Sequence, residues 1–124
     1  MPARRILVVD DYAPAAQALT RLLRLNGHTV MSAATVAEAR TITLDFRPEI
    51  VLLDLNLEAP GDGLIVARWI RAEAGLDGVV LVALTGQCDS QIERRLSAAG
   101  IGHYLVKPIP FAELESIILA ADFR

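Results

Sequence analysis

Residues 50–54 read Ile-Val-Leu-Leu-Asp, four apolar side chains followed by a carboxylate. A short, continuous apolar run is typical of a strand that helices cover on both faces of a parallel sheet. Similar runs recur along the chain, and one weaker run, Thr-Val-Met-Ser-Ala at 29–33, suits an edge strand. The predicted strands are Arg5–Asp10, Thr29–Ala33, Ile50–Asp54, Val79–Thr85 and His103–Val106.

Amphipathic stretches between these strands predict five helices. The first helix is marked by Pro14 at its start and by Asn26-Gly27 at its end. The second and fourth helices are marked by residue pairs with capping-box spacing, Thr35 with Glu38 and Ser90 with Glu93. The third and fifth helices are predicted over Gly63–Ala74 and Phe111–Ala121. Strands alternating with helices predict a (βα)5 chain folded as a three-layer α/β/α sandwich with right-handed crossovers.

Size and composition limit the possible classes of protein. The 124 residues are 53% hydrophobic and carry a formal charge of −3, which predicts a single domain over residues 1–124 with a real core. No apolar run reaches the roughly 18 residues of a transmembrane helix, so we expect no membrane insertion. The arginines form no cluster, which argues against direct nucleic-acid binding. No secretory signal is visible, and the lone Cys88 fits a cytoplasmic location.

Polar side chains follow the predicted strands where each strand ends. Asp10 and Asp11 close the first strand, Asp54 the third, Thr85 the fourth, and Lys107, the one lysine beside eleven arginines, the fifth. Open α/β sheets bind their ligands at the carboxyl ends of their strands, so these five groups are expected to share one site. Read singly, each has an ordinary structural explanation, such as a turn, a helix N-cap or a surface lysine. Their joint placement favours a site.

The chemistry of these groups points to a phosphoryl group and a metal ion. Three carboxylates in one cleft repel one another, and a hard divalent cation such as Mg²⁺ relieves that repulsion. The Lys107 ammonium and the Thr85 hydroxyl can neutralise phosphoryl oxygens while an aspartate attacks phosphorus. Asp54 stands alone at the end of a central strand and is the best nucleophile, whereas Asp10 and Asp11 make a better metal clamp.

With these motifs in place, the chain resembles the receiver domain of two-component response regulators over essentially all 124 residues. The resemblance is carried by Val-Val-Asp-Asp at 8–11, Leu-Leu-Asp-Leu-Asn-Leu at 52–57, Ala-Leu-Thr-Gly at 83–86 and Tyr-Leu-Val-Lys-Pro at 104–108. It implies a flavodoxin-like, doubly wound parallel sheet of five strands in the order 2-1-3-4-5. The third and fourth motifs resemble the receivers of hybrid histidine kinases somewhat more than those of DNA-binding regulators.

The resemblance also implies a role for each site residue. Asp54 would accept a phosphoryl group from a histidine kinase or a histidine phosphotransfer domain. Mg²⁺, or alternatively Mn²⁺, would be held by Asp11, Asp54 and the backbone carbonyl of Asn56, and by Asp10 through a water molecule. Lys107 and Thr85 would contact the phosphoryl oxygens, and the Lys107–Pro108 bond would be cis. Such a domain phosphorylates itself and slowly loses the group but is not a turnover enzyme.

A conformational switch is implied as well. Thr85 would move toward the phosphoryl group and Tyr104 would turn inward. The surface formed by helix four, strand five and helix five would then signal to a downstream protein or an attached effector domain. The simpler interpretation of Tyr104 is a half-buried aromatic residue on an edge strand with its hydroxyl in water. Both descriptions can hold, in the two states.

The chain departs from the receiver pattern after Asp54. Receivers usually carry proline four residues and glycine eight residues after the phosphorylated aspartate, whereas here Glu58 takes the first position and Gly63 comes at nine. We interpret residues 58–63 as a loop with one inserted residue, in which Pro60-Gly61 supplies the turn. Asn56 and Gln87 occupy the positions that tune phosphoryl lifetime, and neither can act as a general base.

Two other functions remain to be weighed. A phosphorylation-independent interaction module could keep this fold, and the altered loop is its only support. An aspartate-dependent hydrolase would need a second acid near Asp54, where the chain has Asn56. Among the isolated residues, we expect His28 and His103 on the surface and Trp69 in the packing of the third helix.

Overall fold

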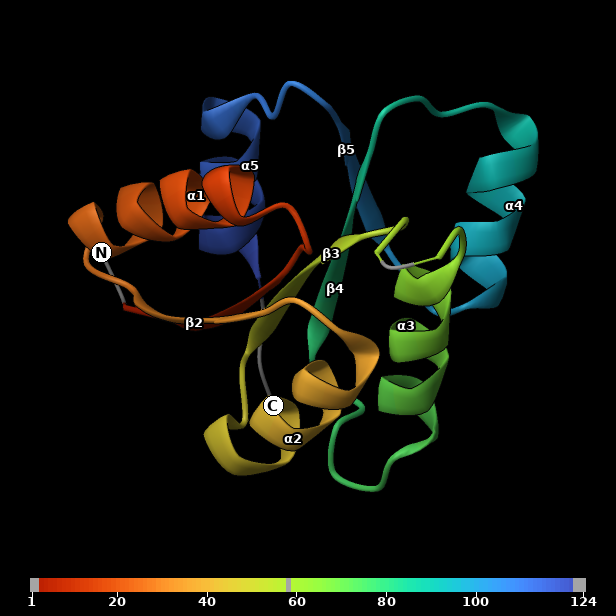
Figure 1. The fold of residues 1–124 in the computed structure, drawn as a ribbon, viewed down its shortest axis with the longest axis horizontal. Helices are drawn as coiled ribbons and strands as arrows, with labels where there is room; N and C mark the ends of the chain where they lie inside the picture. Colours follow the sequence, from red (N-terminus) through yellow and green to blue (C-terminus); the bar gives the residue numbers. More distant parts are fainter. Residues whose placement is uncertain (1–2, 58, 122–124) are drawn as a thin grey trace.

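The computed structural model describes residues 3–57 and 59–121, and it forms a five-stranded parallel sheet between two layers of helices (Figure 1). The strand order is β2-β1-β3-β4-β5, which confirms the predicted doubly wound, flavodoxin-like sheet. The elements are β1 Arg5–Val9, α1 Ala13–Leu25, β2 Thr29–Ala33, α2 Val36–Phe46, β3 Ile50–Asp54, α3 Asp62–Ala72, β4 Val80–Thr85, α4 Ser90–Ala98, β5 His103–Val106 and α5 Phe111–Ala120.

The continuous apolar runs are explained by burial on both faces of the sheet. Successive strand side chains point to opposite faces, so Leu53 packs with α2, α3 and α4 while Leu52 packs with α1 and α5. All five residues of β3, including Asp54, are buried. The predicted edge strand β2, which pairs only with β1, buries just Val30 and Ala33, one in each core, and its three other residues are exposed.

The two predicted capping boxes have different outcomes. At α2, the Thr35 side chain accepts a hydrogen bond from the Glu38 backbone N–H at 3.0 Å, so that prediction is confirmed. At α4, the prediction of Ser90 as the cap is wrong, because Asp89 occupies the extended N-cap position and accepts from the Ile92 N–H at 2.9 Å. The helix therefore starts at Ser90 itself.

His28 is buried, which corrects the prediction that it lies on the surface. Its Nδ1 accepts a hydrogen bond from the backbone N–H of Arg4 at 3.1 Å, joining the starts of β1 and β2. His103 is exposed as predicted. Trp69 packs against the core as expected, and the Arg40 guanidinium of α2 lies 5.6 Å from the centre of its ring.

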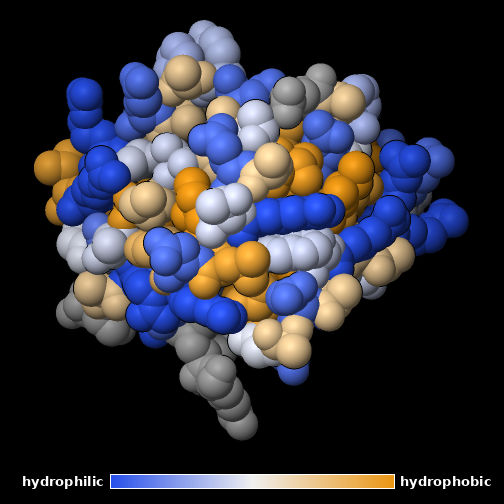
Figure 2. Space-filling model, turned by 60° about the horizontal axis from the view of Figure 1, so that its bottom comes forward, coloured by the Kyte–Doolittle hydropathy of each residue, from blue (hydrophilic) through white to orange (hydrophobic). Residues whose placement is uncertain are grey.

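The molecular surface mixes polar and apolar residues. Figure 2 turns the side that carries α2 toward the viewer, and hydrophobic side chains there are interrupted by hydrophilic ones. In the part of the chain that the structure describes, no helix has the length and apolar character needed to cross a bilayer.

Candidate functional site

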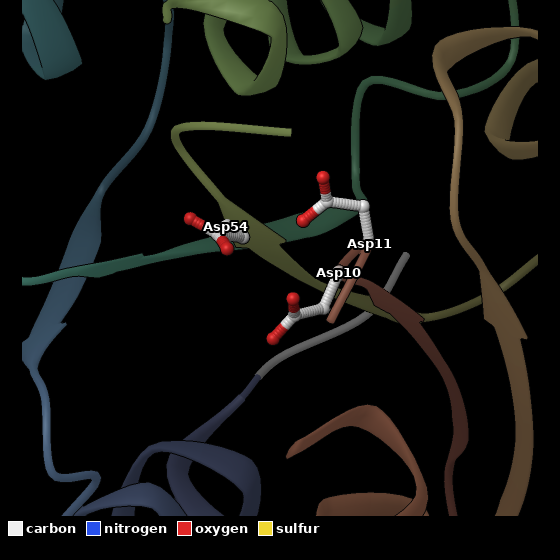
Figure 3. Close-up of side chains that lie close together, drawn as sticks. All are labelled: Asp10, Asp11 and Asp54. Atoms are coloured by element: carbon white, nitrogen blue, oxygen red, sulfur yellow. The ribbon is translucent and has the colours of Figure 1, made fainter. Parts of the chain in front are cut away.

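Three aspartates converge at the carboxyl edge of the sheet, as predicted. Asp54 ends β3, and Asp10 and Asp11 directly follow β1, its hydrogen-bonded neighbour. Their side chains approach one another in Figure 3, and one carboxylate oxygen from each lies within 4.8 Å of the others. Asp10 and Asp54 are buried, whereas Asp11 is exposed at the mouth of the site. The pairing of β1 with β3 therefore creates the cluster that the two sequence motifs suggested separately.

Asp54 is held in place by two hydrogen bonds from different parts of the fold. Its Oδ1 accepts from the backbone N–H of Asn56 at 3.0 Å, and its Oδ2 accepts from the Lys107 ammonium at 3.1 Å. The first bond fixes the carboxylate above the start of the β3–α3 loop. The second links the central strand to the loop that follows the edge strand β5. Lys107, predicted to contact a phosphoryl oxygen, thus bonds the carboxylate of Asp54 in this structure.

Asp10 is buried next to the Asp54 carboxylate, an environment that disfavours its charged form. Its Oδ1 accepts a hydrogen bond from the Tyr12 N–H at 2.9 Å. Burial, and to a smaller extent the nearby Asp54 charge, raises the pKa of the Asp10 carboxyl, while the Tyr12 bond and Lys107 oppose this shift. The site thus carries more negative charge than its own cation balances, which is the condition that favours an added cation.

The Lys107–Pro108 peptide bond is cis, as the resemblance implied. The backbone N–H of Lys107 donates to the Thr85 carbonyl at 2.7 Å, so the end of β5 remains attached to the end of β4. Through this attachment Lys107 and Thr85 stand on the same edge of the sheet as the aspartates.

The Thr85 hydroxyl bonds the backbone of Gln87 in this conformation. It donates to the Gln87 carbonyl at 2.6 Å and accepts from the Gln87 N–H at 3.4 Å, forming a local turn. Thr85 is buried, and because Asp89 caps α4, the alternative interpretation of Thr85 as the helix cap is excluded. Contact with a phosphoryl oxygen would require the hydroxyl to leave the Gln87 carbonyl.

Tyr104 faces outward with 40% of its surface exposed. Its hydroxyl donates to Glu93 Oε1 on α4 at 3.2 Å. The Glu93 carboxylate, with a smaller contribution from Cys88, raises the pKa of the Tyr104 phenol. The side chain is solvent-exposed, as the simpler interpretation expects, and its hydroxyl also forms a bond that joins β5 to α4.

The loop after Asp54 contains a steric requirement that the sequence did not reveal. The N–H of Gly63 donates to the Leu55 carbonyl at 3.1 Å, and a Cβ on Gly63 would lie 2.3 Å from the Asp54 carbonyl oxygen. Gly61 adopts a positive φ of 87°, and its N–H donates to the Asn56 side-chain oxygen at 3.3 Å. The predicted Pro60-Gly61 turn thus precedes α3, while Glu58 lies outside the described residues.

The donor set fits a hard divalent cation. The three carboxylates of Asp10, Asp11 and Asp54 supply oxygen ligands of the kind that Mg²⁺, Ca²⁺ and Mn²⁺ prefer, and none of the three is a soft ligand. The exposed Asp11 leaves the site open to solvent. The acidic cluster is therefore able to hold a metal ion.

Comparison with known protein families matches residues 6–119 to the response regulator receiver domain. Among curated relatives, the DNA-binding response regulator MtrA of Mycolicibacterium paratuberculosis is 37% identical over 118 residues, which is 94% of this chain and 50% of the relative. The transcriptional regulatory protein PrrA of Mycobacterium tuberculosis is 36% identical over 94% of this chain and 48% of its own length. The chain thus spans about half the length of these relatives.

Two solved structures show the same architecture. The receiver domain of sensor histidine kinase PA1611 from Pseudomonas aeruginosa, solved with magnesium coordinated in its active site cleft, is 28% identical. Its TM-score is 0.85, and the match covers 97% of this chain and 98% of that one. The chemotaxis protein CheY4 of Vibrio cholerae is 21% identical, with a TM-score of 0.89 over 98% and 100% of the two chains, and this likeness concerns the fold.

Proposed function

Since this chain belongs to the response regulator receiver domain family, a family of signalling domains rather than turnover enzymes, we propose that Asp54 is its phosphoacceptor. The observation that supports this role is the pair of bonds that present its carboxylate, from the Asn56 N–H and from the Lys107 ammonium. Asp10 is engaged by Tyr12 and Asp11 lies at the solvent-exposed rim, so Asp54 is the central, doubly oriented carboxylate. Residues 1–124 would form this single domain.

The proposed reaction is a direct transfer from a phosphohistidine. A carboxylate oxygen of Asp54 forms a bond to phosphorus while the phosphorus–nitrogen bond of the donor breaks, and the imidazole nitrogen keeps the electron pair. The Lys107 ammonium exchanges its bond to Asp54 for a bond to a phosphoryl oxygen, which a compact ammonium on a flexible side chain can reach. The Thr85 hydroxyl breaks its bond to the Gln87 carbonyl and donates to another phosphoryl oxygen.

We assign the metal to Mg²⁺, with Mn²⁺ as the closest substitute. Asp11, Asp54 and the Asn56 carbonyl would be the protein ligands, and Asp10 would act through a bound water. A bound cation supplies positive charge that offsets the carboxylates and the incoming phosphoryl group. Asp10 then serves mainly to orient that water, because its own Oδ1 is fixed by the Tyr12 N–H.

We propose that Thr85 and Tyr104 act together as a switch. In the present conformation Thr85 bonds Gln87, and Tyr104 bonds Glu93 on α4. Movement of Thr85 toward a phosphoryl oxygen would leave space beside β4 that the Tyr104 ring can fill, breaking its bond to Glu93. The surface of α4, β5 and α5 would change as a result. Phosphorylation shifts this equilibrium only as far as it binds the second conformation better.

An apolar groove that could receive the phosphoryl donor lies next to the acidic cluster. A groove of about 430 Å³ runs between α1 and the β5–α5 connection, and Asp10 and Lys107 stand at its edge. Its apolar lining includes Ala15, Ala18, Leu19, Leu22, Ile109 and Phe111. A two-component receiver implies a kinase partner, and we propose that a histidine kinase or histidine phosphotransfer domain in the cytoplasm docks here. The output would pass to a downstream protein or an attached effector domain.

Phosphorylation by acetyl phosphate with Mg²⁺ tests the proposal. Intact-mass measurement should show one added phosphoryl group on the wild type and none on Asp54→Ala, with both proteins folded by circular dichroism. Beryllofluoride with Mg²⁺ should likewise perturb the wild type alone. An unmodified wild type that also binds no metal would instead favour the phosphorylation-independent interaction module.

The lifetime of the phosphoryl group is expected to be moderate to long. Asn56 and Gln87 offer amides rather than a base to an attacking water, and the Asn56 side-chain oxygen is bonded to the Gly61 N–H. Asn56→Asp should therefore accelerate decay of the acyl phosphate, by roughly tenfold or more if the new carboxylate acts as a general base. Decay is followed by mass after removal of acetyl phosphate, with Gln91→Glu on exposed α4 as the control for added charge. Rapid loss from the wild type would contradict this expectation.

A further inference from the structure

A second groove lies between α3 and α4, on the opposite face of the sheet from α1. Its volume is about 680 Å³, and the residues that line it come from the β3–α3 loop, α3, the β4–α4 loop and α4. The two helices lie side by side in Figure 1. Leu96 is the buried residue that anchors α4, and Ile92, one turn earlier, is only partly covered. The inner face of α4 is thus incompletely occupied by the domain itself.

The groove has an apolar base and cationic sides. Leu55, Leu64, Ile92 and Leu96 provide aliphatic surface, while Arg68 on α3 and Arg95 on α4 contribute two guanidinium groups. Both arginines are exposed. Within residues 3–57 and 59–121, no aspartate or glutamate lines the groove, and neither arginine side chain forms a hydrogen bond or ion pair. Arg71, by contrast, donates to the carbonyls of Gly100, Asp77 and Val79.

The local charge is opposite to that of the whole chain. The protein carries a formal charge of −3, yet this groove presents two cations. An anionic partner therefore gains a complementary surface here that a neutral or basic one does not. The aliphatic base offers no aromatic surface on which a nucleotide base could stack, so the chemistry favours a peptide with both aliphatic and carboxylate side chains.

We propose that the α3–α4 groove binds an acidic amphipathic segment of a partner protein. Aliphatic side chains of that segment would cover the partly buried Leu64 and Ile92, and its carboxylates would pair with Arg68 and Arg95. Guanidinium groups form bidentate bonds with carboxylates, which gives such pairing directional specificity. This binding surface is separate from the apolar α1 groove to which the phosphoryl donor is assigned.

The groove is joined to the acceptor site at one end. Asn56, Thr85 and Gln87 line it, and these residues also adjoin Asp54 or form the Thr85 turn. When Thr85 leaves the Gln87 carbonyl, the lining of the groove changes. Occupancy of the groove and phosphorylation are then coupled, and the coupling acts equally in both directions. This coupling rests on the proposed function, whereas the binding itself does not.

Selection from a random dodecapeptide library displayed on phage tests the binding in the absence of any phosphoryl donor. The immobilised wild-type domain should enrich peptides that combine at least two acidic with at least two large aliphatic residues. A fluorescein-labelled copy of the most enriched peptide is then titrated by fluorescence anisotropy. Arg68→Glu and Arg95→Glu should each raise the Kd of this peptide by about tenfold or more, because each substitution places a glutamate next to the acidic residues of the peptide.

Arg94→Glu is the matched control, because Arg94 neighbours Arg95 on α4 and is exposed but does not line the groove. It should change the Kd by less than about twofold, and a peptide with lysine in place of its acids should bind Arg95→Glu better than the wild type. The proposal is overturned if no peptide is enriched, if the enriched peptides lack acids, or if Arg94→Glu weakens binding as much as Arg95→Glu.

Beryllofluoride with Mg²⁺ tests the coupling separately. It should change the Kd of the same peptide by about threefold or more in the wild type and not in Asp54→Ala, which cannot take the analogue. An unchanged Kd in a wild type that demonstrably binds beryllofluoride overturns the coupling. Failure of beryllofluoride to bind at all counts against the phosphoacceptor function. The anisotropy measured without the analogue still tests whether the groove binds the peptide.

Discussion

Lys107 illustrates how a single residue type can be required at a site. Its ammonium contacts Asp54 Oδ2 at 3.1 Å, while the N–H of the same residue is bonded to the Thr85 carbonyl. The backbone of Lys107 is therefore anchored, while its long side chain could exchange one acceptor for another. A compact ammonium can move from a carboxylate oxygen to a nearby phosphoryl oxygen, whereas a planar guanidinium is longer and needs two aligned acceptors.

Lys107→Arg should keep the charge and still impair the domain. We expect phosphorylation of Asp54 by acetyl phosphate to slow by about tenfold or more, equivalent to about 1.4 kcal/mol in the barrier, or else the response of Tyr104 to phosphorylation to be lost. Intact-mass kinetics measures the first, and tyrosine resonances in NMR spectra with and without beryllofluoride measure the second. Arg94→Lys, an exposed exchange of the same two residue types, is the control. Wild-type behaviour in both measurements would contradict the assigned role.

At the scale of elements, the β3–α3 connection depends on the close approach of Gly63 to the end of β3. The Gly63 N–H bonds the Leu55 carbonyl, and there is no room for a side chain against the Asp54 backbone. Gly63→Ala should displace the start of α3 and with it Asp54, lowering the free energy of unfolding by about 1–3 kcal/mol and weakening Mg²⁺ binding. Urea denaturation and a metal titration measure the two effects. Gly102→Ala, where a Cβ meets nothing within 4 Å, should be nearly neutral; equal losses in both variants would refute the steric argument.

The elements also show what sequence patterns can and cannot specify. The strands were predictable because their apolar runs follow from burial on both faces, and the site because strand ends share one edge. The capping residue of α4 could not be predicted, because Asp89 and Ser90 are adjacent and both are good N-cap residues. Only the extended backbone conformation of Asp89 identifies it as the cap. The distance in sequence between Asp54 and Gly63 indicates an inserted residue in the loop, but the steric role of Gly63 depends on a contact across that loop. Burial of His28 agrees with the alternation through Val30, yet the partner of its Nδ1 is Arg4, which is remote in sequence.

At the scale of the whole molecule, His28 links stability to pH. Burial, and secondarily the Arg4 charge, lowers the pKa of the His28 imidazole from its ordinary 6.5, while Glu115 opposes the shift. Between the folded and unfolded pKa values, His28 is therefore neutral in the folded state and protonated in the unfolded state. The contribution of His28 is complete above about pH 6.5 and declines as pH falls toward the folded pKa, with a slope of up to about 1.4 kcal/mol per pH unit.

His28→Asn tests this linkage, because asparagine keeps an acceptor for the Arg4 N–H and does not titrate. Urea denaturation between pH 5 and 7.5 should show a flatter dependence in the variant than in the wild type. His103→Asn, at the exposed histidine, should leave the wild-type profile unchanged. Parallel profiles for wild type and His28→Asn would show that another group is responsible.

The acidic cluster should make the stability of the whole domain depend on metal. Three carboxylates with oxygens within 4.8 Å of one another are costly without a cation, and the pKa of Asp10 is raised by burial and by Asp54. For a carboxyl with a raised folded pKa, stability is complete below the unfolded pKa and is lost as pH rises through the folded one, so the cost is present once Asp10 is ionised. A cation that binds only the folded state stabilises it by about 2.7 kcal/mol at a hundred times its Kd.

Asp10→Asn separates the two contributions, because the amide oxygen can still accept the Tyr12 N–H while one buried charge is removed. At pH 7 in EDTA, we expect the variant to be more stable than the wild type by about 1 kcal/mol, an ordinary size for a single substitution. Its gain on adding Mg²⁺ should be smaller, since the loss of a second-sphere carboxylate weakens metal affinity by about 10–100-fold. Urea denaturation with EDTA and with Mg²⁺ measures both, and Asp45→Asn on exposed α2 should match the wild type in each. If Asp10→Asn is no more stable in EDTA and gains as much from Mg²⁺ as the wild type, Asp10 contributes neither repulsion nor metal orientation.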